Sequence, residues 1–279
     1  MIPLPDTNDI NRIADWIELY VLSEDRGISK SKIISVLEGC SVSIDEETID
    51  SAISELVRRL TLYGSVKPYE IKNNVISPKF NWEKYPEFTL CLYYSTFGVS
   101  KNVKGVPADK GTKLFEEITK VCIESHLNCK SFVFGFPSTD SFKTQLDKFA
   151  LLIRENRYED PNTTDKDRGV DIIAWKEFDE FRNNSVLFFI QFAAGKHWGE
   201  KKAVSIESYR SYFNFNYKAV ISSLSITQII AIEDWNNATN DYGIIIDRAR
   251  LYRAITSDSY SMESSIKTKI KNWCKAKLN

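Results

Sequence analysis

Several residue types and patterns that common enzyme mechanisms require are rare or absent in this chain. Its 279 residues include only two histidines, which argues against a Ser-His-Asp hydrolase. It has no glycine-rich phosphate-binding loop, no internal repeat and no low-complexity segment. No apolar run approaches the roughly 20 residues of a membrane-spanning helix. The N-terminal residues lack the charged-then-apolar layout of a signal peptide. We therefore expect a cytoplasmic protein that does not bind membranes.

The cysteines show none of the paired spacings that mark disulfide frameworks or zinc sites. With no export signal, they are expected to be free thiols in a reducing cytoplasm. Cys122, His126 and Cys129 lie close together along one predicted helix, but no fourth zinc ligand accompanies them. Zinc is therefore not expected. The five cysteines are Cys40, Cys91, Cys122, Cys129 and Cys274.

The composition is that of an ordered protein large enough for more than one core. Hydrophobic residues make up 43% and aromatic residues 13% of the chain, so a substantial interior can be buried. A length of 279 residues suggests two domains. We divide the chain into an N-terminal domain over residues 1–87, a connector over 88–110 and a C-terminal domain over 111–279. The connector begins with an apolar stretch, which predicts that it packs between the two domains.

The N-terminal domain is predicted to contain three helices followed by a β-hairpin. Ser29 and Asp45 are the predicted N-caps of the second and third helices. Asn73-Asn74 is the predicted hairpin turn. The predicted helices cover residues 13–23, 30–38 and 46–64. Three helices followed by a hairpin resemble a winged-helix domain, a module that often lays its third helix in the major groove of DNA.

The charge of this domain argues against groove binding. Residues 1–87 carry 10 basic and 15 acidic groups, and the third helix would present Glu46 and Glu47 to the phosphates. Because nucleic-acid affinity depends largely on phosphate neutralisation, a protein-interaction or dimerisation role is the better expectation. A local DNA contact stays open for the basic residues Lys30, Lys32, Arg58 and Arg59.

Residues 111–127 are predicted to form an amphipathic helix that carries two adjacent glutamates. At about 100° per residue, Glu117 lies on the solvated face. Glu116 projects onto a second apolar stripe instead. Of the two carboxylates, Glu116 is therefore the one expected to point toward protein.

Two strands of the C-terminal domain each carry one polar residue where an apolar one is expected. The runs 169–175 and 185–193 are apolar on both faces, as in central strands covered by helices on each side. Asp171 interrupts the first run and Gln191 the second. A polar group buried without a partner costs roughly 1–3 kcal/mol. Each side chain could bond to neighbouring backbone groups alone, but a carboxylate and an amide together offer the oxygen ligands that a hard divalent cation prefers.

Strand alternation assigns each of these polar side chains to a face. Asp171 is expected to share a face with Ile173 and Trp175, while Gln191 shares one with Phe189.

This arrangement resembles the PD-(D/E)xK nuclease superfamily, the fold of many restriction endonucleases, in the variant where glutamine replaces the glutamate. The order of helix 111–127, strand 131–137, a strand with Asp171 and a strand with Gln191 is similar to that of the superfamily core. The G-x-x-x-F-E setting of an acidic helix residue is matched by the six residues that end at Glu116. The resemblance implies an α/β fold. It would be a restriction-endonuclease-like mixed sheet flanked by helices, preceded by a small helical winged-helix-like domain.

The lysine departs from the superfamily pattern. That pattern has a lysine two residues after the acid or amide, where this chain has Ala193. Lys196 lies three residues further on, and strict alternation would put it on the wrong face unless Gly195 lets the chain bend. Lys201 and Lys202, which are expected to open the next helix, are the other candidates.

The resemblance implies Mg²⁺-dependent hydrolysis of DNA phosphodiester bonds, with Mn²⁺ as a substitute cation. Asp171 would bind the metal with Glu116 as a further ligand, and Gln191 would coordinate or orient through its carbonyl. Lys196 or Lys201 would position the attacking water and offset charge in the transition state. Superfamily members with extra interaction domains often belong to restriction or anti-phage defence systems, so an effector role is expected by analogy.

Two other classes of protein compete with the nuclease hypothesis. The first is a catalytically inactive protein of the same fold that serves as a DNA- or protein-binding subunit. The second is an adaptor whose winged-helix-like domain recruits partners or mediates self-association. The missing lysine at Ala193 favours these alternatives, whereas Asp171, Gln191 and Glu116 favour the enzyme.

Overall fold

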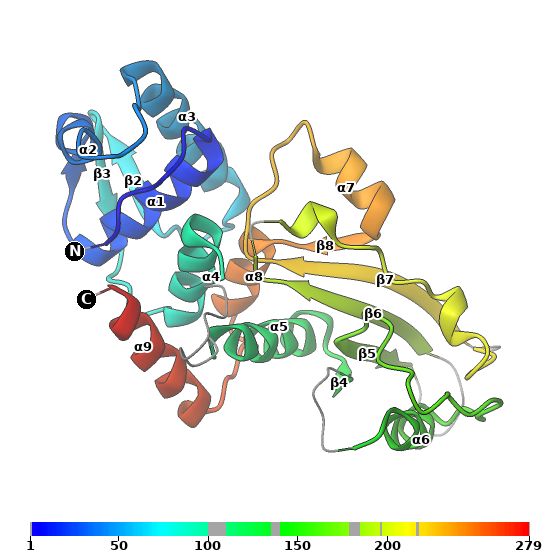
Figure 1. Cartoon of the computed structure of the whole chain (residues 1–279). Helices are drawn as coiled ribbons and strands as arrows, with labels where there is room; N and C mark the ends of the chain where they lie inside the picture. Colours follow the sequence, from blue (N-terminus) through cyan, green and yellow to red (C-terminus); the bar gives the residue numbers. More distant parts are fainter. Residues whose placement is uncertain are drawn as a thin grey trace.

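The computed structural model describes residues 2–99, 110–134, 140–178, 185–195, 197–215 and 218–278. A helical N-terminal region lies on one side, a twisted β-sheet lies on the other, and further helices lie between them (Figure 1). Within the described ranges no helix is both long and apolar enough to cross a membrane. The five cysteines are free thiols, as expected.

The N-terminal region contains the expected three helices and hairpin. Its strands form an antiparallel sheet in the order β1-β3-β2. Ser29 and Asp45 accept hydrogen bonds from the backbone amide three residues later, which starts the second and third helices as predicted. Asn73 and Asn74 both have positive φ and form the hairpin turn. The elements are α1 (Ile10–Glu24), β1 (Ile28–Ser29), α2 (Lys30–Leu37), α3 (Glu46–Leu62), β2 (Tyr69–Lys72) and β3 (Val75–Pro78).

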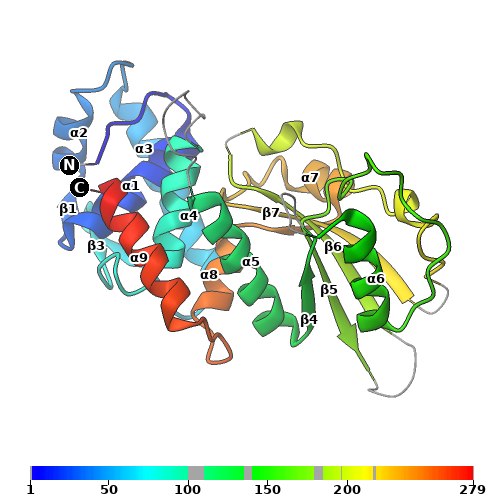
Figure 2. The same ribbon diagram turned by 60° about the horizontal axis from the view of Figure 1, so that its bottom comes forward.

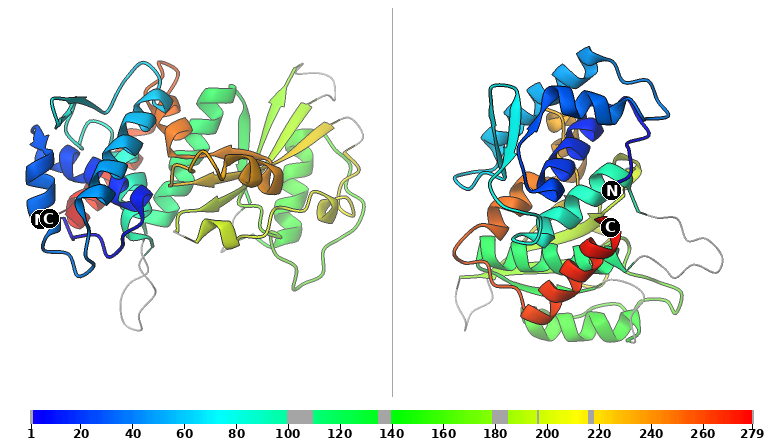
Figure 3. Two further views of the ribbon diagram at one scale, coloured as in Figure 1. Left: turned by 90° about the horizontal axis from the view of Figure 1, so that it is seen from above. Right: turned by 90° about the vertical axis from the view of Figure 1, so that its left-hand side faces the viewer.

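The apolar start of the connector is a buried helix, α4 (Pro86–Phe97). It packs against α1, α8 (Arg248–Ile255) and the C-terminal helix α9 (Ser264–Leu278). It therefore contacts elements from both the N-terminal and the C-terminal parts of the chain. Helix α9 returns to the N-terminal region, so the two chain ends lie side by side (Figure 3).

The C-terminal part is built on a five-stranded mixed sheet in the order β4-β5-β6-β7-β8. Strands β4, β5 and β6 are antiparallel, whereas β6, β7 and β8 are parallel. Strand β4 ends at Val133, and residues 135–137 of the predicted strand lie outside the described residues. The strands are β4 (Lys130–Val133), β5 (Ile172–Glu177), β6 (Ser185–Ala193), β7 (Lys218–Ile226) and β8 (Ile244–Ile246).

Helices cover both faces of this sheet, which confirms the predicted α/β class. Helix α5 (Gly111–Leu127) and helix α6 (Phe142–Ile153) lie on opposite faces (Figure 2). Ile172 and Ile190 pack with α5, while Ile173 and Phe189 pack with α6. The predicted alternation is therefore confirmed for the strand interiors. The remaining elements are η1 (Trp198–Glu200), η2 (Glu207–Tyr209) and α7 (Trp235–Tyr242), of which η1 and η2 are short 3-10 helices.

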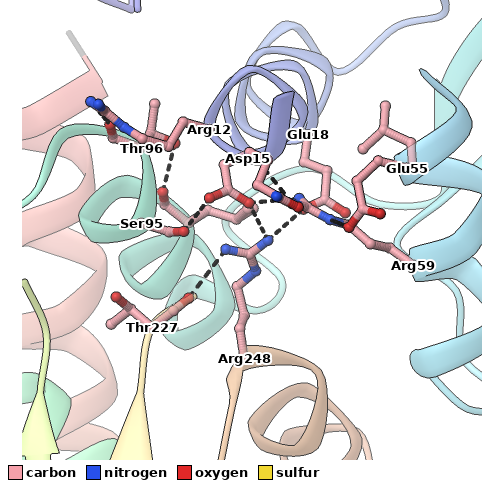
Figure 4. Close-up of polar contacts among 12 residues, drawn as sticks. Arg12, Asp15, Glu18, Glu55, Arg59, Ser95, Thr96, Thr227 and Arg248 are labelled. Carbon is pink, nitrogen blue, oxygen red and sulfur yellow. Dashed lines mark hydrogen bonds and ion pairs between the residues drawn. The ribbon is translucent and has the colours of Figure 1, made fainter. Parts of the chain in front are cut away.

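A buried group of four charged side chains joins the N-terminal region to α8 (Figure 4). Arg59 of α3 and Arg248 of α8 both contact Asp15 Oδ1, at 2.6 and 2.5 Å. They also contact Glu18 Oε2, at 3.3 and 3.0 Å. None of the four side chains is more than 3% exposed. We call this group the charge quartet. It crosses the predicted boundary after residue 87, and the division into two domains itself stays a prediction.

Candidate functional site

A pocket of about 390 Å³ lies where β5 begins and β6 ends. Its wall includes Glu116 from α5, Asp171 from the residue before β5, and Lys201 from the segment after η1. Phe192 of β6 adds an apolar side chain to this wall, and His197 adds a polar one. We call it the strand-end pocket. Three of the predicted site residues, from three separate segments, therefore line one cavity.

The carboxylate of Asp171 is held in place by the backbone. The chain enters from Gly169, which has a φ of +83°. The backbone N–H of Asp171 donates to the carbonyl of Ile190 at 3.0 Å. Asp171 Oδ2 accepts a hydrogen bond from the amide of Phe192 at 2.7 Å. These bonds fix the carboxylate at the end of β6.

Asp171 does not lie on its predicted face. It lines the strand-end pocket with Phe115 and Glu116 of α5, whereas Ile173 and Trp175 pack on the α6 side. The reason is that Asp171 precedes the first residue of β5, so strand alternation does not govern its side chain.

The surroundings of Asp171 disfavour its ionised form. Burial raises the pKa of its carboxyl to about 6, and the negative charges of Glu116 and Asp167 add to the rise. The amide of Phe192 and the ammonium of Lys201 act in the opposite direction without cancelling it. A carboxyl that resists ionisation in a pocket, with another carboxylate near it, is typical of a functional site. A bound cation would relieve the repulsion.

Glu116 is half-buried, as its predicted orientation toward protein implies. Its side chain is 20% exposed, and its Oε2 forms a salt bridge with Lys113 Nζ at 2.7 Å. The adjacent Glu117 is not among the residues that line the pocket. The structure therefore directs one of the two neighbouring glutamates, Glu116, into the cavity.

Gln191 does not line the strand-end pocket, although it neighbours Phe192 in the chain. Its side chain faces Gly169, where an added Cβ would lie 3.0 Å from Gln191 Nε2. Within the described chain, Gln191 Oε1 is buried without a hydrogen-bond partner. The structure does not bring Gln191 together with Asp171 and Glu116 in this cavity. A coordinating role for Gln191 stays a prediction.

The lysine candidates differ in what the structure describes. Lys196 lies outside the described residues. Lys201 lines the pocket and lowers the pKa of Asp171 by its charge. Lys201 was predicted to open the next helix, and this prediction is wrong. Lys201 follows the three-residue helix η1 in an extended conformation, with φ −67° and ψ 139°, and the described residues Lys202 to Ser205 form no helix.

Two residues near Asp171 were not identified from the sequence. His197 lines the pocket, with its Nδ1 3.2 Å from Glu200 Oε1. Asp167 accepts a hydrogen bond from the amide of Gly169 and raises the pKa of Asp171. His197 is one of only two histidines and directly follows Lys196, which was a usable signal. Asp167 lies in an acidic loop that resembles an ordinary solvated turn, so no clear signal marked it.

The side chains of the pocket fit a hard divalent cation in part. Asp171 and Glu116 supply carboxylate oxygens, the ligand type that Mg²⁺ prefers. The described residues contain no group of three or more His, Cys, Asp or Glu side chains placed to hold a metal. Mg²⁺ commonly uses one or two carboxylates and keeps several waters, whereas a structural zinc site needs four protein ligands. The donor set therefore suits Mg²⁺ better than zinc.

No protein-family model and no curated protein matches this chain. Two solved structures show a weak likeness. The restriction endonuclease FokI bound to DNA is 10% identical, with 95% of this chain and 48% of that chain covered and a TM-score of 0.20. FokI in a second structure is 10% identical, with 92% and 45% covered and a TM-score of 0.19. The chain thus spans about half the length of these structures. At such scores the likeness carries no argument.

Proposed function

We propose that this protein is a divalent-cation-dependent endonuclease that hydrolyses phosphodiester bonds in DNA. The observation that carries the proposal is the strand-end pocket itself. Two carboxylates and one ammonium, those of Asp171, Glu116 and Lys201, line it from separate segments of the chain. Phosphodiester hydrolysis requires that a cation be bound and that negative charge on the phosphate be offset. These residues supply groups for both tasks.

The proposed roles follow from the chemistry of each group. Asp171 and Glu116 would hold Mg²⁺, which when bound polarises the phosphate and lowers the pKa of a coordinated water. The amide of Phe192 keeps the Asp171 carboxylate in one orientation. The ammonium of Lys201 would offset the negative charge that develops on the phosphate. Because the pKa of Asp171 is about 6, its carboxylate becomes available to a cation above that pH.

Substitution of Asp171 tests this proposal. Asp171→Asn keeps the shape and one acceptor oxygen but removes the charge that would bind the cation. We expect Mg²⁺-dependent cleavage of plasmid DNA to fall by about a hundredfold or more. Asp147→Asn is the matched control, because Asp147 is half-exposed on α6 and lies outside the pocket. Wild-type cleavage by the Asp171→Asn protein would show that the activity lies elsewhere.

The lysine is tested by comparing two variants on the same DNA. Lys201→Met should reduce cleavage by about a hundredfold, an effect typical of losing one charge-stabilising group. Lys196→Met should leave cleavage near the wild-type rate, because we assign the role to Lys201. The opposite result would transfer the role to Lys196. Equal wild-type activity in both variants would leave no lysine in the role.

A second candidate function is that of an inactive nuclease-fold protein that binds DNA or another protein. The position of Gln191 outside the pocket favours it, because one of the predicted ligands is then missing. The acidic N-terminal region suits a protein partner or self-association. DNA binding without cleavage in Mg²⁺ and in Mn²⁺ would support this alternative. With either candidate function, we propose a role in a restriction or anti-phage defence system.

A further inference from the structure

A second charged pocket, of about 370 Å³, lies between α3 and α8, away from the strand-end pocket. Three arginines line it: Arg58 of α3, and Arg250 and Arg253 of α8. None of these residues contributes to the strand-end pocket. We call the second cavity the arginine pocket.

The three guanidinium groups differ in the hydrogen bonds and ion pairs that they already form within the protein. Arg58 forms a two-point contact with Glu55, at 2.6 and 2.7 Å. Arg250 donates to the carbonyl of Ile245 at 2.5 Å and stacks over the ring of Trp235, at 4.9 Å from its centroid. Arg253 is exposed, and its guanidinium has no hydrogen bond or ion pair within the described part of the chain. The pocket therefore holds a preformed positive charge that an anion could use.

Besides the arginines, the wall carries Thr61 and the carboxylate of Asp247, which is buried and accepts a hydrogen bond from the amide of Arg250 at 3.0 Å. The remaining side chains of the wall are apolar. Leu62, Ile230, Ala249 and the ring of Trp235 line the same cavity. Ile232, also on the wall, is 72% exposed, which is unusual for a large aliphatic side chain. Apolar walls with a few convergent polar groups are typical of pockets for small ligands, and the volume is within their usual range. The wall suits a ring system, and the arginines suit phosphate oxygens.

An acidic groove next to this pocket limits the size of the anion. The groove shares Arg58 and Ile232 with the arginine pocket. Its own wall carries the carboxylates of Glu47, Asp50 and Glu233. A long polyanion leaving the pocket in that direction would meet like charge, which is unfavourable. A short ligand that ends inside the pocket avoids this repulsion.

We propose that the arginine pocket binds a small nucleotide, with its phosphate on Arg253 and Arg250 and its base on the apolar wall. Guanidinium groups bind phosphate through two parallel hydrogen bonds, which a lysine cannot do. The base would cover the exposed side chain of Ile232 and remove its apolar surface from water. This site is separate from the proposed nuclease site and does not depend on it.

The walls of the arginine pocket adjoin the charge quartet. Arg58 neighbours Arg59 on α3, and Arg250 lies two residues after Arg248 on α8. A bound nucleotide would therefore touch both helices that the quartet joins. Because it binds the folded state alone, it should also raise the stability of the protein.

Calorimetric titration of the full chain tests this proposal. AMP, adenosine, inorganic phosphate and a short DNA duplex are titrated separately, in EDTA so that no cation occupies the strand-end pocket. We expect AMP to bind, and to bind at least tenfold more tightly than adenosine or phosphate alone. Arg253→Gln should weaken AMP binding about tenfold or more. Arg26→Gln is the matched control, because Arg26 is exposed, does not line this pocket and should leave binding unchanged.

Three outcomes would overturn the proposal. The first is no AMP binding to the wild-type protein. The second is equal AMP affinity in Arg253→Gln and wild type while both remain folded by circular dichroism. The third is binding of the duplex, weakened by Arg253→Gln, with no binding of AMP, which would make these arginines a contact for a DNA backbone. Arg253 is exposed, so its substitution should not disturb folding.

Discussion

Two aspartates of this protein, the buried Asp15 and the half-buried Asp171, have opposite electrostatic surroundings. Asp15, in the charge quartet, contacts two guanidinium groups. Burial alone would raise its pKa, but Arg248 and Arg59 outweigh that effect and hold the pKa below its ordinary value of 3.8. Asp171, in the strand-end pocket, contacts no guanidinium of the described residues, and burial raises its pKa to about 6.

The comparison distinguishes charges that hold the fold together from charges that are placed for a function. In the quartet the carboxylates contact arginines, so the charges are balanced inside the protein. Removal of one carboxylate would leave a surplus of buried positive charge. In the strand-end pocket, Asp171 and Glu116 line the same cavity as Lys201, and the charge of Glu116 raises the pKa of Asp171. The first arrangement holds two parts of the chain together. The second leaves a negative site that a cation could occupy.

The largest effect should come from breaking the quartet. Asp15→Asn removes one negative charge and leaves Arg59 and Arg248 with a buried positive surplus. We expect the free energy of unfolding at pH 7 to fall by about 3–5 kcal/mol, measured by urea denaturation. Glu207→Gln is the control, because its ion pair with Arg210 is exposed and its loss should have little effect. A small loss in Asp15→Asn would mean that the quartet does not hold the two parts together.

The same isosteric change at Asp171 should act in the opposite direction. A pKa of about 6 in place of 3.8 corresponds to at most about 3 kcal/mol of destabilisation by the ionised carboxylate. Asp171→Asn keeps an oxygen that can accept from Phe192 and removes the charge. Without divalent cation, we expect the variant to be about 1–3 kcal/mol more stable than wild type at pH 7.

The pH dependence of that difference checks its cause. The folded-state pKa of Asp171 is raised, so the stability linked to its protonated form is present below about pH 4 and is lost as the pH rises through about 6. The advantage of Asp171→Asn over wild type should therefore appear between these values and stay constant above them. A variant less stable than wild type at pH 7 would mean that the ionised carboxylate is stabilised by the fold.

Much of the fold could be predicted from local sequence because local rules determine it. Ser29 and Asp45 begin helices as caps, and Asn73-Asn74 forms the hairpin turn. The limits of α5 follow the predicted range 111–127. The charge quartet could not be predicted, because Asp15 and Arg248 are 233 residues apart and no local pattern couples them. Long-range pairing depends on how the helices pack, which periodicity does not encode.

The candidate site was predictable by residue type more than by geometry. Asp171 and Glu116 stand out because each is a carboxylate in an apolar setting, and both line one pocket. The face of Asp171 was predicted wrongly because strand alternation was extended to a residue that precedes β5. Lys201 was placed in a helix, but the chain there is extended after η1. Loop conformations of this kind follow from tertiary contacts and not from a repeating pattern.

A cation should remove part of the contrast between the two aspartates. Mn²⁺ at about ten times its dissociation constant should raise the stability of the wild-type protein by about 1.4 kcal/mol. The same addition should leave Asp171→Asn unchanged, because its cation-binding charge is gone. Thermal unfolding with and without Mn²⁺ measures both. An equal rise in the two proteins would show that Mn²⁺ binds outside the strand-end pocket.

The smallest expected effect concerns how Lys201 influences Asp171. Its ammonium lowers the pKa of Asp171, whereas the stronger influence of Glu116 raises it. Lys201→Met should therefore raise the pKa of Asp171 above about 6, and Glu116→Gln should lower it by a larger amount. Carboxyl-carbon NMR titration measures both shifts, with Lys202→Met as the control because Lys202 does not line the pocket. A pKa that Lys201→Met leaves unchanged would place the ammonium too far from Asp171 to act in the same site, and Lys196 would then be the remaining candidate.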